Sequence, residues 1–155
     1  MKIAVFPGSF DPITKGHTDI VERALPLFDQ IIVAVGINSS KKYFFSLNQR
    51  LTFLKAAFEH EPKVKIDTYQ QLTVDYCHSQ GAQFMLRGIR NASDFVYENT
   101  IAQLNRVMGK DLETVFLISD APYNYYSSTI VREILYGGGD VSTFVPESVF
   151  KLISK

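Results

Sequence analysis

Short apolar runs alternate with segments of helical periodicity along this chain. The apolar runs predict strands at residues 3–6, 30–36, 64–67, 83–86 and 114–118, and residues 30–36, β-branched and almost uniformly apolar, have the profile of a central strand covered on both faces. Between them, apolar residues recur every three or four positions. This spacing predicts helices at residues 18–28, 46–58, 72–79 and 93–108, from 127 or 128 to 136, and from Pro146 onward.

This alternation predicts an α/β fold of Rossmann-like type. We expect an open five-stranded parallel sheet with helices on both faces, joined by right-handed crossovers. Residues 46–49 form a capping box, and Gly109 follows the long predicted helix as a stop signal. In that long helix, Tyr97, Ile101, Leu104 and Met108 share one face.

Length and composition indicate one ordinary globular domain over residues 1–155. The chain is 46% hydrophobic and 21% charged, with a formal net charge of zero. A balanced charge argues against a dedicated nucleic-acid or anionic-membrane surface. The apolar runs are too short to span a bilayer, and the N-terminus lacks a signal-peptide pattern. The single cysteine, Cys77, excludes an intramolecular disulfide, and we expect a packed thiol in a cytoplasmic protein.

The loop between the first strand and the first helix is the most informative stretch. It contains Gly8, Pro12 and Gly16 and leads to His17 at the start of the helix. In an open parallel sheet this loop lies at the carboxyl end of the first strand, where ligands collect. The amides at the helix start carry a partial positive charge, so they and His17 could face one anion. A helix-capping role for His17 is the structural alternative.

Several other nucleotide and metal signatures are absent. No Walker sequence occurs, no GxGxxG follows a strand, and no Cys/His cluster has zinc spacing. His60 and His78 stand alone in helical segments, where they are expected to be ordinary surface or packing residues.

Three segments, in order, resemble the motifs of one enzyme family. Residues 14–17, Thr-Lys-Gly-His, resemble the (H/T)xGH signature of the nucleotidyltransferase superfamily. Residues 87–90 and 126–132 resemble its RGxR and ISSTxxR segments, with Tyr126 where the pattern has Ile. Together, and with the preceding 8–12 loop, they resemble the phosphopantetheine adenylyltransferase family over the whole chain.

The resemblance implies transfer of AMP from ATP to 4′-phosphopantetheine, giving dephospho-coenzyme A and pyrophosphate. The attacking phosphate is already anionic, so direct in-line displacement needs no general base. It needs positioning and stabilisation of charge, and the implied catalytic residues are His17, Lys41 and Arg90. Magnesium is expected as a cofactor held mainly through the ATP phosphates, with no protein metal ligand. A homohexamer and feedback binding of coenzyme A are implied as well.

The resemblance also divides the candidate site between the two substrates. Lys41 is the implied phosphate-binding lysine, with Lys42 left on the surface. The implied phosphopantetheine residues are Ser9, Lys41, Thr73 and Arg87. The implied ATP residues are Ser9, Phe10, His17, Gly88, Ile89, Arg90, Glu98, Tyr123, Asn124, Tyr125, Tyr126, Ser127, Ser128 and Thr129.

Alternatives remain for several of these residues. Asp11 is as consistent with a structural role as with a functional one, because Pro12 forces it into an extended conformation. Arg87 and Arg90 suit bidentate phosphate contacts, with a surface salt bridge as the alternative. Glu98 could contact adenine, ribose or Arg90, and Arg132 could reach the same phosphates as residues 127–129.

Two other functions compete with this interpretation. One is a nucleotidyltransferase that uses CTP, or that accepts nicotinamide mononucleotide or glycerol phosphate. The other is a non-catalytic nucleotide sensor on the same fold. Acceptor-dependent release of pyrophosphate distinguishes all three.

Overall fold

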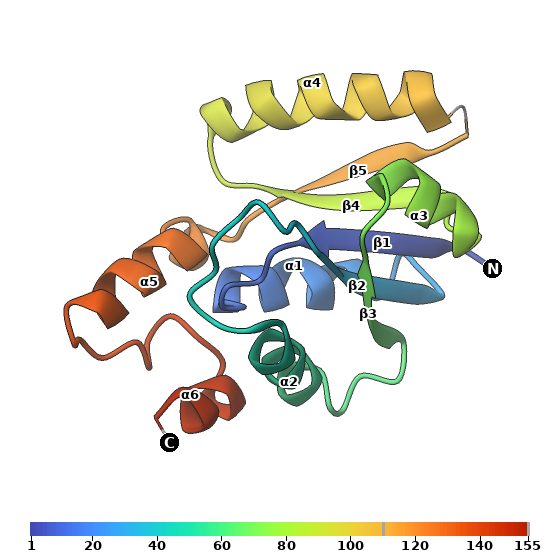
Figure 1. Cartoon of the computed structure of the whole chain (residues 1–155). Helices are drawn as coiled ribbons and strands as arrows, with labels where there is room; N and C mark the ends of the chain where they lie inside the picture. The colour runs from blue at the N-terminus through green and yellow to red at the C-terminus, as the bar shows by residue number, and fades with distance from the viewer. Residues whose placement is uncertain (110, 155) are drawn as a thin grey trace.

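Five parallel strands form a single sheet in the computed structural model, which describes residues 1–109 and 111–154 (Figure 1). The strands are β1 (Ile3–Gly8), β2 (Gln30–Gly36), β3 (Val64–Tyr69), β4 (Phe84–Ile89) and β5 (Glu113–Ile118). They lie in the order β3-β2-β1-β4-β5, and each neighbouring pair is parallel. This confirms the predicted α/β class and its five-stranded parallel sheet.

The strand order reverses beside β1. Ala4 of β1 pairs with Ile31 of β2 on one side and with Phe84 of β4 on the other. The chain runs from β1 out to β3, then returns across the sheet to begin β4. The loops that follow β1 and β4 therefore diverge and leave a crevice at the carboxyl ends of these strands.

Helices cover both faces of the sheet (Figure 1). Ile31 and Val33 of β2 belong to a core that includes residues of α1, α2 and α6, whereas Ile32 and Ala34 face a second core that includes α3. The α4 helix lies on the same side as α3. The helices are α1 (Lys15–Ala24), α2 (Leu47–Ala57), α3 (Thr73–Ser79), α4 (Ala92–Gly109), α5 (Ser128–Tyr136) and α6 (Glu147–Ile153), with a 3-10 turn η1 (Ala121–Tyr123) before α5.

The predicted bounds of several elements were wrong, including those of the first helix and the third strand. The first helix begins at Lys15, behind an extended Thr14, and ends at Ala24 rather than at residue 28. Pro26 explains the early end, because it has no N–H with which to continue the helix; Leu25, just before it, still has helical geometry. The third strand continues past residue 67 to Tyr69, which pairs with Gly36.

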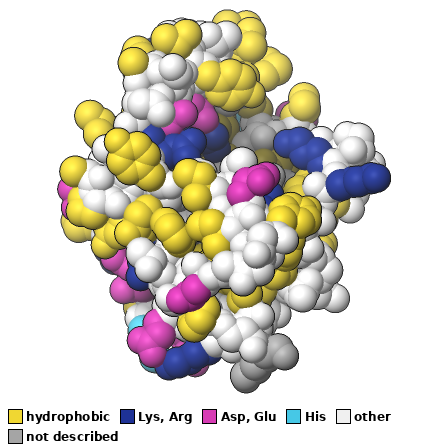
Figure 2. Space-filling model, turned by 90° about the vertical axis from the view of Figure 1, so that its left-hand side faces the viewer, with side chains coloured by type: hydrophobic (Ala, Val, Ile, Leu, Met, Phe, Trp, Pro, Cys, Tyr) yellow, Lys and Arg dark blue, Asp and Glu magenta, His cyan; other side chains and the backbone are white. Residues whose placement is uncertain are grey.

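The apolar face of α4 points away from the sheet. Tyr97, Leu104 and Met108 are 66%, 53% and 55% exposed, although their spacing resembles that of a packed stripe. The buried positions include two polar residues, Glu98 and Asn105. The reason is that this side of α4 covers the polar crevice. Figure 2 views the molecule from the crevice edge and shows hydrophobic side chains gathered at the top, over α4.

No helix in residues 1–109 or 111–154 combines the length and the apolar character that crossing a bilayer requires.

Candidate active site

The crevice between β1 and β4 holds two adjoining cavities. The large cavity has a volume of about 580 Å³ and the small cavity about 320 Å³. Pro7, Gly8, Ser9, Arg87 and Glu98 contribute to the walls of both. Two ligands bound side by side would therefore meet at the ends of β1 and β4.

Thr14 fixes the imidazole of His17 in the first turn of α1. The backbone N–H of Thr14 donates to His17 Nδ1 at 3.0 Å, and the Thr14 hydroxyl lies 2.9 Å from the same nitrogen. Because the amide hydrogen cannot rotate away, Nδ1 must be the unprotonated acceptor, and the neutral ring carries its proton on Nε2. His17 thus caps α1 and retains one N–H donor while lining the small cavity.

The surroundings of His17 favour the neutral ring. Its edge packs on Phe10, with 5.2 Å between the ring centroids. Desolvation by burial, together with the positive charges of Arg90 and Arg87, lowers the pKa of His17 from 6.5 to about 4. Both arginines line the small cavity with His17. At neutral pH this site presents an uncharged imidazole donor beside two fixed cations.

The loop that precedes α5 packs directly against the start of α1. The Thr14 hydroxyl donates to the carbonyl of Tyr126 at 2.8 Å. A Cβ atom added at Gly16 would lie only 3.2 Å from that carbonyl oxygen, which explains why a glycine stands before His17. The first and third motifs are therefore joined in space although more than a hundred residues separate them.

The hydroxyls at the start of α5 have structural partners. Ser127 caps the helix by accepting the N–H of Ile130, and Ser128 donates to the carbonyl of Pro12 at 2.7 Å. The amides of the first turn have no intrahelical acceptor, and they carry the positive end of the helix dipole. The phosphate cradle expected here consequently depends mainly on backbone amides, with Arg132 bonded to Thr129 at its edge.

Both arginines of the second motif form ion pairs at the cavity wall. Arg87 donates to both carboxylate oxygens of Glu98, one of them at 2.8 Å, and also to the carbonyl of Pro7. Arg90 pairs with Asp94, with 3.0 Å between Nε and Oδ2. Of the alternatives for Glu98, the contact with Arg90 is not formed, and Glu98 pairs with Arg87 instead. Both arginines form salt bridges and also line the cavities.

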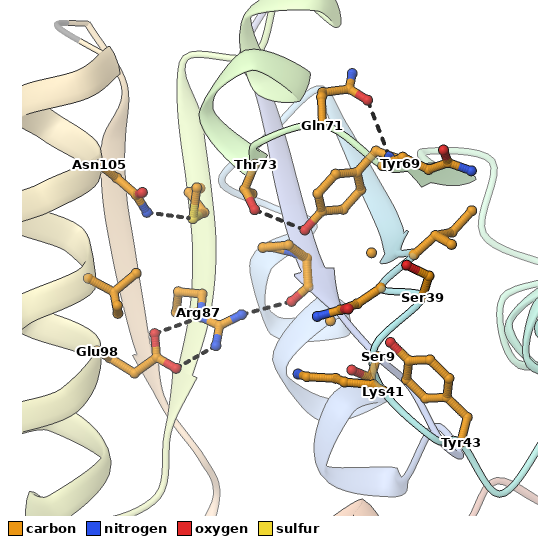
Figure 3. Close-up of a pocket in the computed structure, with 18 of the residues that line it drawn as sticks. Ser9, Ser39, Lys41, Tyr43, Tyr69, Gln71, Thr73, Arg87, Glu98 and Asn105 are labelled. Carbon is orange, nitrogen blue, oxygen red and sulfur yellow. Dashed lines mark hydrogen bonds and ion pairs between the residues drawn. The ribbon is translucent and has the colours of Figure 1, made fainter.

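Hydroxyl and amine groups surround the large cavity (Figure 3). Ser9, Lys41 and Tyr43 lie together on one side of it, and Arg87 lies on the other. At its far end, Tyr69 Oη and Thr73 Oγ1 are 3.0 Å apart. Burial raises the pKa of Tyr69 and keeps its phenol neutral. This wall can hydrogen-bond an extended polar ligand whose anionic end lies near Lys41.

Most of the predicted site residues line one of the two cavities. Ser9, Lys41, Thr73, Arg87 and Glu98 line the large cavity. The small cavity is lined by Ser9, Phe10, His17, Arg87, Gly88, Arg90, Glu98, Tyr123, Tyr126, Ser127, Ser128, Thr129 and Arg132.

Three predicted residues do not line either cavity. Ile89 packs into the protein with 7% exposure, Tyr125 is 77% exposed, and Asn124 ends the η1 turn. These residues were predicted because they belong to continuous motif segments. A folded segment turns only some of its residues toward the cavity.

Sequence reasoning missed several wall residues. Tyr43, Tyr69 and Asn105 line the large cavity, and Asp94 lines the small one. Asp94 was detectable, because it stands four residues after Arg90 in a helix and can form an ion pair with it. The other three come from segments with no motif.

No group of three or more potential metal-ligating side chains occurs in residues 1–109 or 111–154. The carboxylates that line the cavities are already engaged: Asp11 with backbone amides, Asp94 with Arg90, and Glu98 with Arg87. Cys77 is buried in the second core, and burial raises its pKa to about 11. The cavities thus offer donors for anions, in the form of Lys, Arg, imidazole and amide groups.

A family model and known relatives match this chain. The model described as cytidylyltransferase-like matches residues 5–134. The phosphopantetheine adenylyltransferase of Christiangramia forsetii is 54% identical over 97% of this chain and 99% of its own. That of Flavobacterium psychrophilum is 51% identical over 96% and 98%, and that of Desulforudis audaxviator 45% identical over 99% and 94%.

Proposed function

The chain belongs to the cytidylyltransferase-like family, and we propose that it acts there as a phosphopantetheine adenylyltransferase. In this reaction a phosphate oxygen of 4′-phosphopantetheine forms a bond to the α-phosphorus of ATP. The bond from that phosphorus to the β-phosphate bridging oxygen breaks, and pyrophosphate leaves with its electron pair. The products are dephospho-coenzyme A and pyrophosphate, an intermediate step of coenzyme A biosynthesis.

The pair of adjoining cavities is the observation that carries this proposal. We assign ATP to the small cavity, where the amides of α5, Arg90 and His17 face one space. The acceptor belongs in the large cavity, with its phosphate near Ser9, Lys41 and Arg87. The shared wall at the ends of β1 and β4 brings the two reacting phosphates together, so that positioning supplies much of the rate acceleration.

His17 contributes a hydrogen bond and does not act as a base. The acceptor phosphate is already ionised, so no proton has to be removed from it. Nδ1 accepts from Thr14, which leaves Nε2–H as the donor toward a phosphate oxygen. A neutral donor can strengthen its hydrogen bond as negative charge develops in the transition state. Lys41 and Arg90 add positive charge on either side.

Magnesium fits this donor set as an ion carried by the nucleotide. Every carboxylate that lines the small cavity already has a partner, so ATP phosphates and water would supply the magnesium ligands. The bound ion would neutralise part of the phosphate charge. Lys41 and Arg90 would hold the remaining oxygens.

The proposed reaction is tested by measuring pyrophosphate release from the purified protein. ATP with magnesium and 4′-phosphopantetheine should give steady turnover, and CTP in place of ATP should give little. Nicotinamide mononucleotide and glycerol phosphate serve as the competing acceptors. Turnover only with one of these acceptors, or ATP binding with no acceptor-dependent turnover, contradicts the proposal.

We also propose a homohexamer, a cytoplasmic location and feedback by coenzyme A. The exposed apolar face of α4, with Tyr97, Leu104 and Met108, supports contact between copies. Coenzyme A contains the product of the reaction within its structure, so it would compete for both cavities. Sedimentation velocity, cell fractionation and inhibition by coenzyme A against each substrate test these proposals separately.

A further inference from the structure

The buried carboxylate of Asp11 joins two segments of the site. Its Oδ2 accepts the backbone N–H of Phe44 at 2.7 Å, and its Oδ1 accepts that of Phe45 at 2.8 Å. Asp11 is only 3% exposed, so these charge-assisted bonds form away from water. A charged group buried in this way is stable only when such partners are present.

Asp11 also belongs to the nucleotide side of the site. Its backbone carbonyl accepts from Arg132 of α5 at 2.8 Å, and the neighbouring Pro12 carbonyl accepts from Ser128. The main chain at residue 11 is therefore bonded to α5, which borders the small cavity. Its side chain is bonded to the loop that borders the large cavity. One residue thus links the two walls.

Lys41 lies in the middle of the loop that follows β2. The position of this part of the loop is fixed by the hydrogen bonds at the two ends of the loop. The loop leaves β2 where the N–H of Ile37 bonds the carbonyl of Tyr69, and a local turn joins Lys41 N–H to Asn38. The next anchor is at residues 44 and 45, on Asp11. Figure 3 shows the Lys41 side chain extending into the large cavity beside Ser9 and Tyr43.

Arg50 of α2 reinforces the same anchor. Its side chain is 3% exposed and donates to the carbonyl of Ser9 at 2.8 Å. Its guanidinium lies 4.0 Å from the centre of the Tyr43 ring, a cation–π contact. Its Nε is buried with no hydrogen-bond partner within the described residues. Burying a charge there is unfavourable by itself, so the contacts with Ser9 and Tyr43 are what stabilise the guanidinium.

We infer that Asp11, supported by Arg50, is a positioning residue that sets Lys41 over the acceptor phosphate relative to the nucleotide cradle. This inference rests on the proposed function, because it requires Lys41 to act on the acceptor. This positioning role differs from a purely structural one, because the effect of Asp11 on catalysis must depend on the Lys41 amine.

A double-mutant cycle of Asp11→Asn and Lys41→Ala tests it, with kcat/KM for 4′-phosphopantetheine as the measurement. Asparagine keeps the shape but accepts only one of the two amide bonds. Asp11→Asn alone should lower kcat/KM by about tenfold or more, the effect of losing a charge-assisted hydrogen bond. In the Lys41→Ala background the same change should lower it by less than about twofold.

The controls separate positioning from loss of stability. Asp67→Asn changes another carboxylate that accepts two hydrogen bonds, from Thr68 and Tyr76, outside both cavity walls. It should leave kcat/KM near that of the wild type. The Kd of ATP should stay unchanged in all variants. If Asp11→Asn does not fold, Arg50→Lys replaces it in the cycle, because it weakens the same anchor from α2.

The inference would be overturned if Asp11→Asn lowered kcat/KM equally with and without the Lys41 amine. It would also be overturned if Asp11→Asn alone kept the wild-type kcat/KM. A wild-type protein without turnover on 4′-phosphopantetheine would instead contradict the proposed function. The two failures are therefore distinguishable.

Discussion

Acid should destabilise this protein partly through His17. The pKa of His17 falls from 6.5 to about 4 on folding, so the unfolded chain binds a proton more readily at this residue. Between these two values the unfolded state holds more protons, and stability must decrease as the pH falls. The stabilisation is fully present above pH 6.5 and is lost as the pH approaches 4.

The size of this effect follows from the pKa difference. At about 1.4 kcal/mol per unit, complete titration corresponds to about 3.5 kcal/mol, of which about 2.5 kcal/mol is lost by pH 4.5. His17→Ala removes this contribution and leaves the titrating carboxylates in place. The difference in unfolding free energy between wild type and variant should therefore shrink by about 2.5 kcal/mol from pH 7 to pH 4.5.

Urea unfolding of both proteins at a series of pH values measures this difference. His60→Ala is the matched control, because it removes an imidazole that is exposed in the folded protein. The unfolding free energy of His60→Ala, plotted against pH, should run parallel to that of the wild type. Parallel curves for His17→Ala would refute the reasoning, since they would mean that His17 binds protons equally in both states.

Three further predictions concern the site and its surroundings. Gly16→Ala places a methyl group 3.2 Å from the Tyr126 carbonyl oxygen, so it should separate α1 from the loop before α5. It should lower kcat by about tenfold in the pyrophosphate assay, and an unchanged rate would show that this contact is not needed. Glu98→Gln leaves Arg87 without its counter-charge and should lower the urea-unfolding free energy by about 1–2 kcal/mol, whereas an unaltered midpoint would mean that the pair contributes nothing. Cys77, with its pKa raised from 9.0 to about 11, should react with iodoacetamide about a hundredfold more slowly in the native protein than in urea; equal rates would contradict its burial.

The sequence was most informative where local chemistry determines structure. The short apolar runs predicted the five strands of the sheet, most clearly at residues 30–36, where a central parallel strand covered on both faces is apolar almost throughout. The loop from Gly8 to His17 predicted a crevice at the end of β1, since strand, glycine-containing loop and helix form a βα unit. A cavity role and a helix cap were alternatives for His17, and the structure shows a cap through Nδ1 in a residue that also lines the small cavity.

Tertiary contacts account for most of what the sequence did not show. Arg50 of α2 is buried because Ser9 and Tyr43, from distant segments, provide its partners. The apolar spacing of α4 predicted a shared face, but a periodicity does not show whether that face meets the sheet. Tyr43, in the loop after β2, and Tyr69, at the end of β3, meet at the large cavity through tertiary structure, which local sequence does not show.

The central claim is that donors from separate loops converge on the reacting phosphates and stabilise their transition state. His17 and Arg90 do lie in one cavity, as this requires. The most direct test compares kcat and the Kd of ATP for the wild type and His17→Ala. We predict that kcat falls at least about a hundredfold, on the order of 3 kcal/mol, while the Kd changes by less than about threefold. An unchanged kcat with weakened ATP binding would contradict the account, because His17 would then bind substrate and transition state alike.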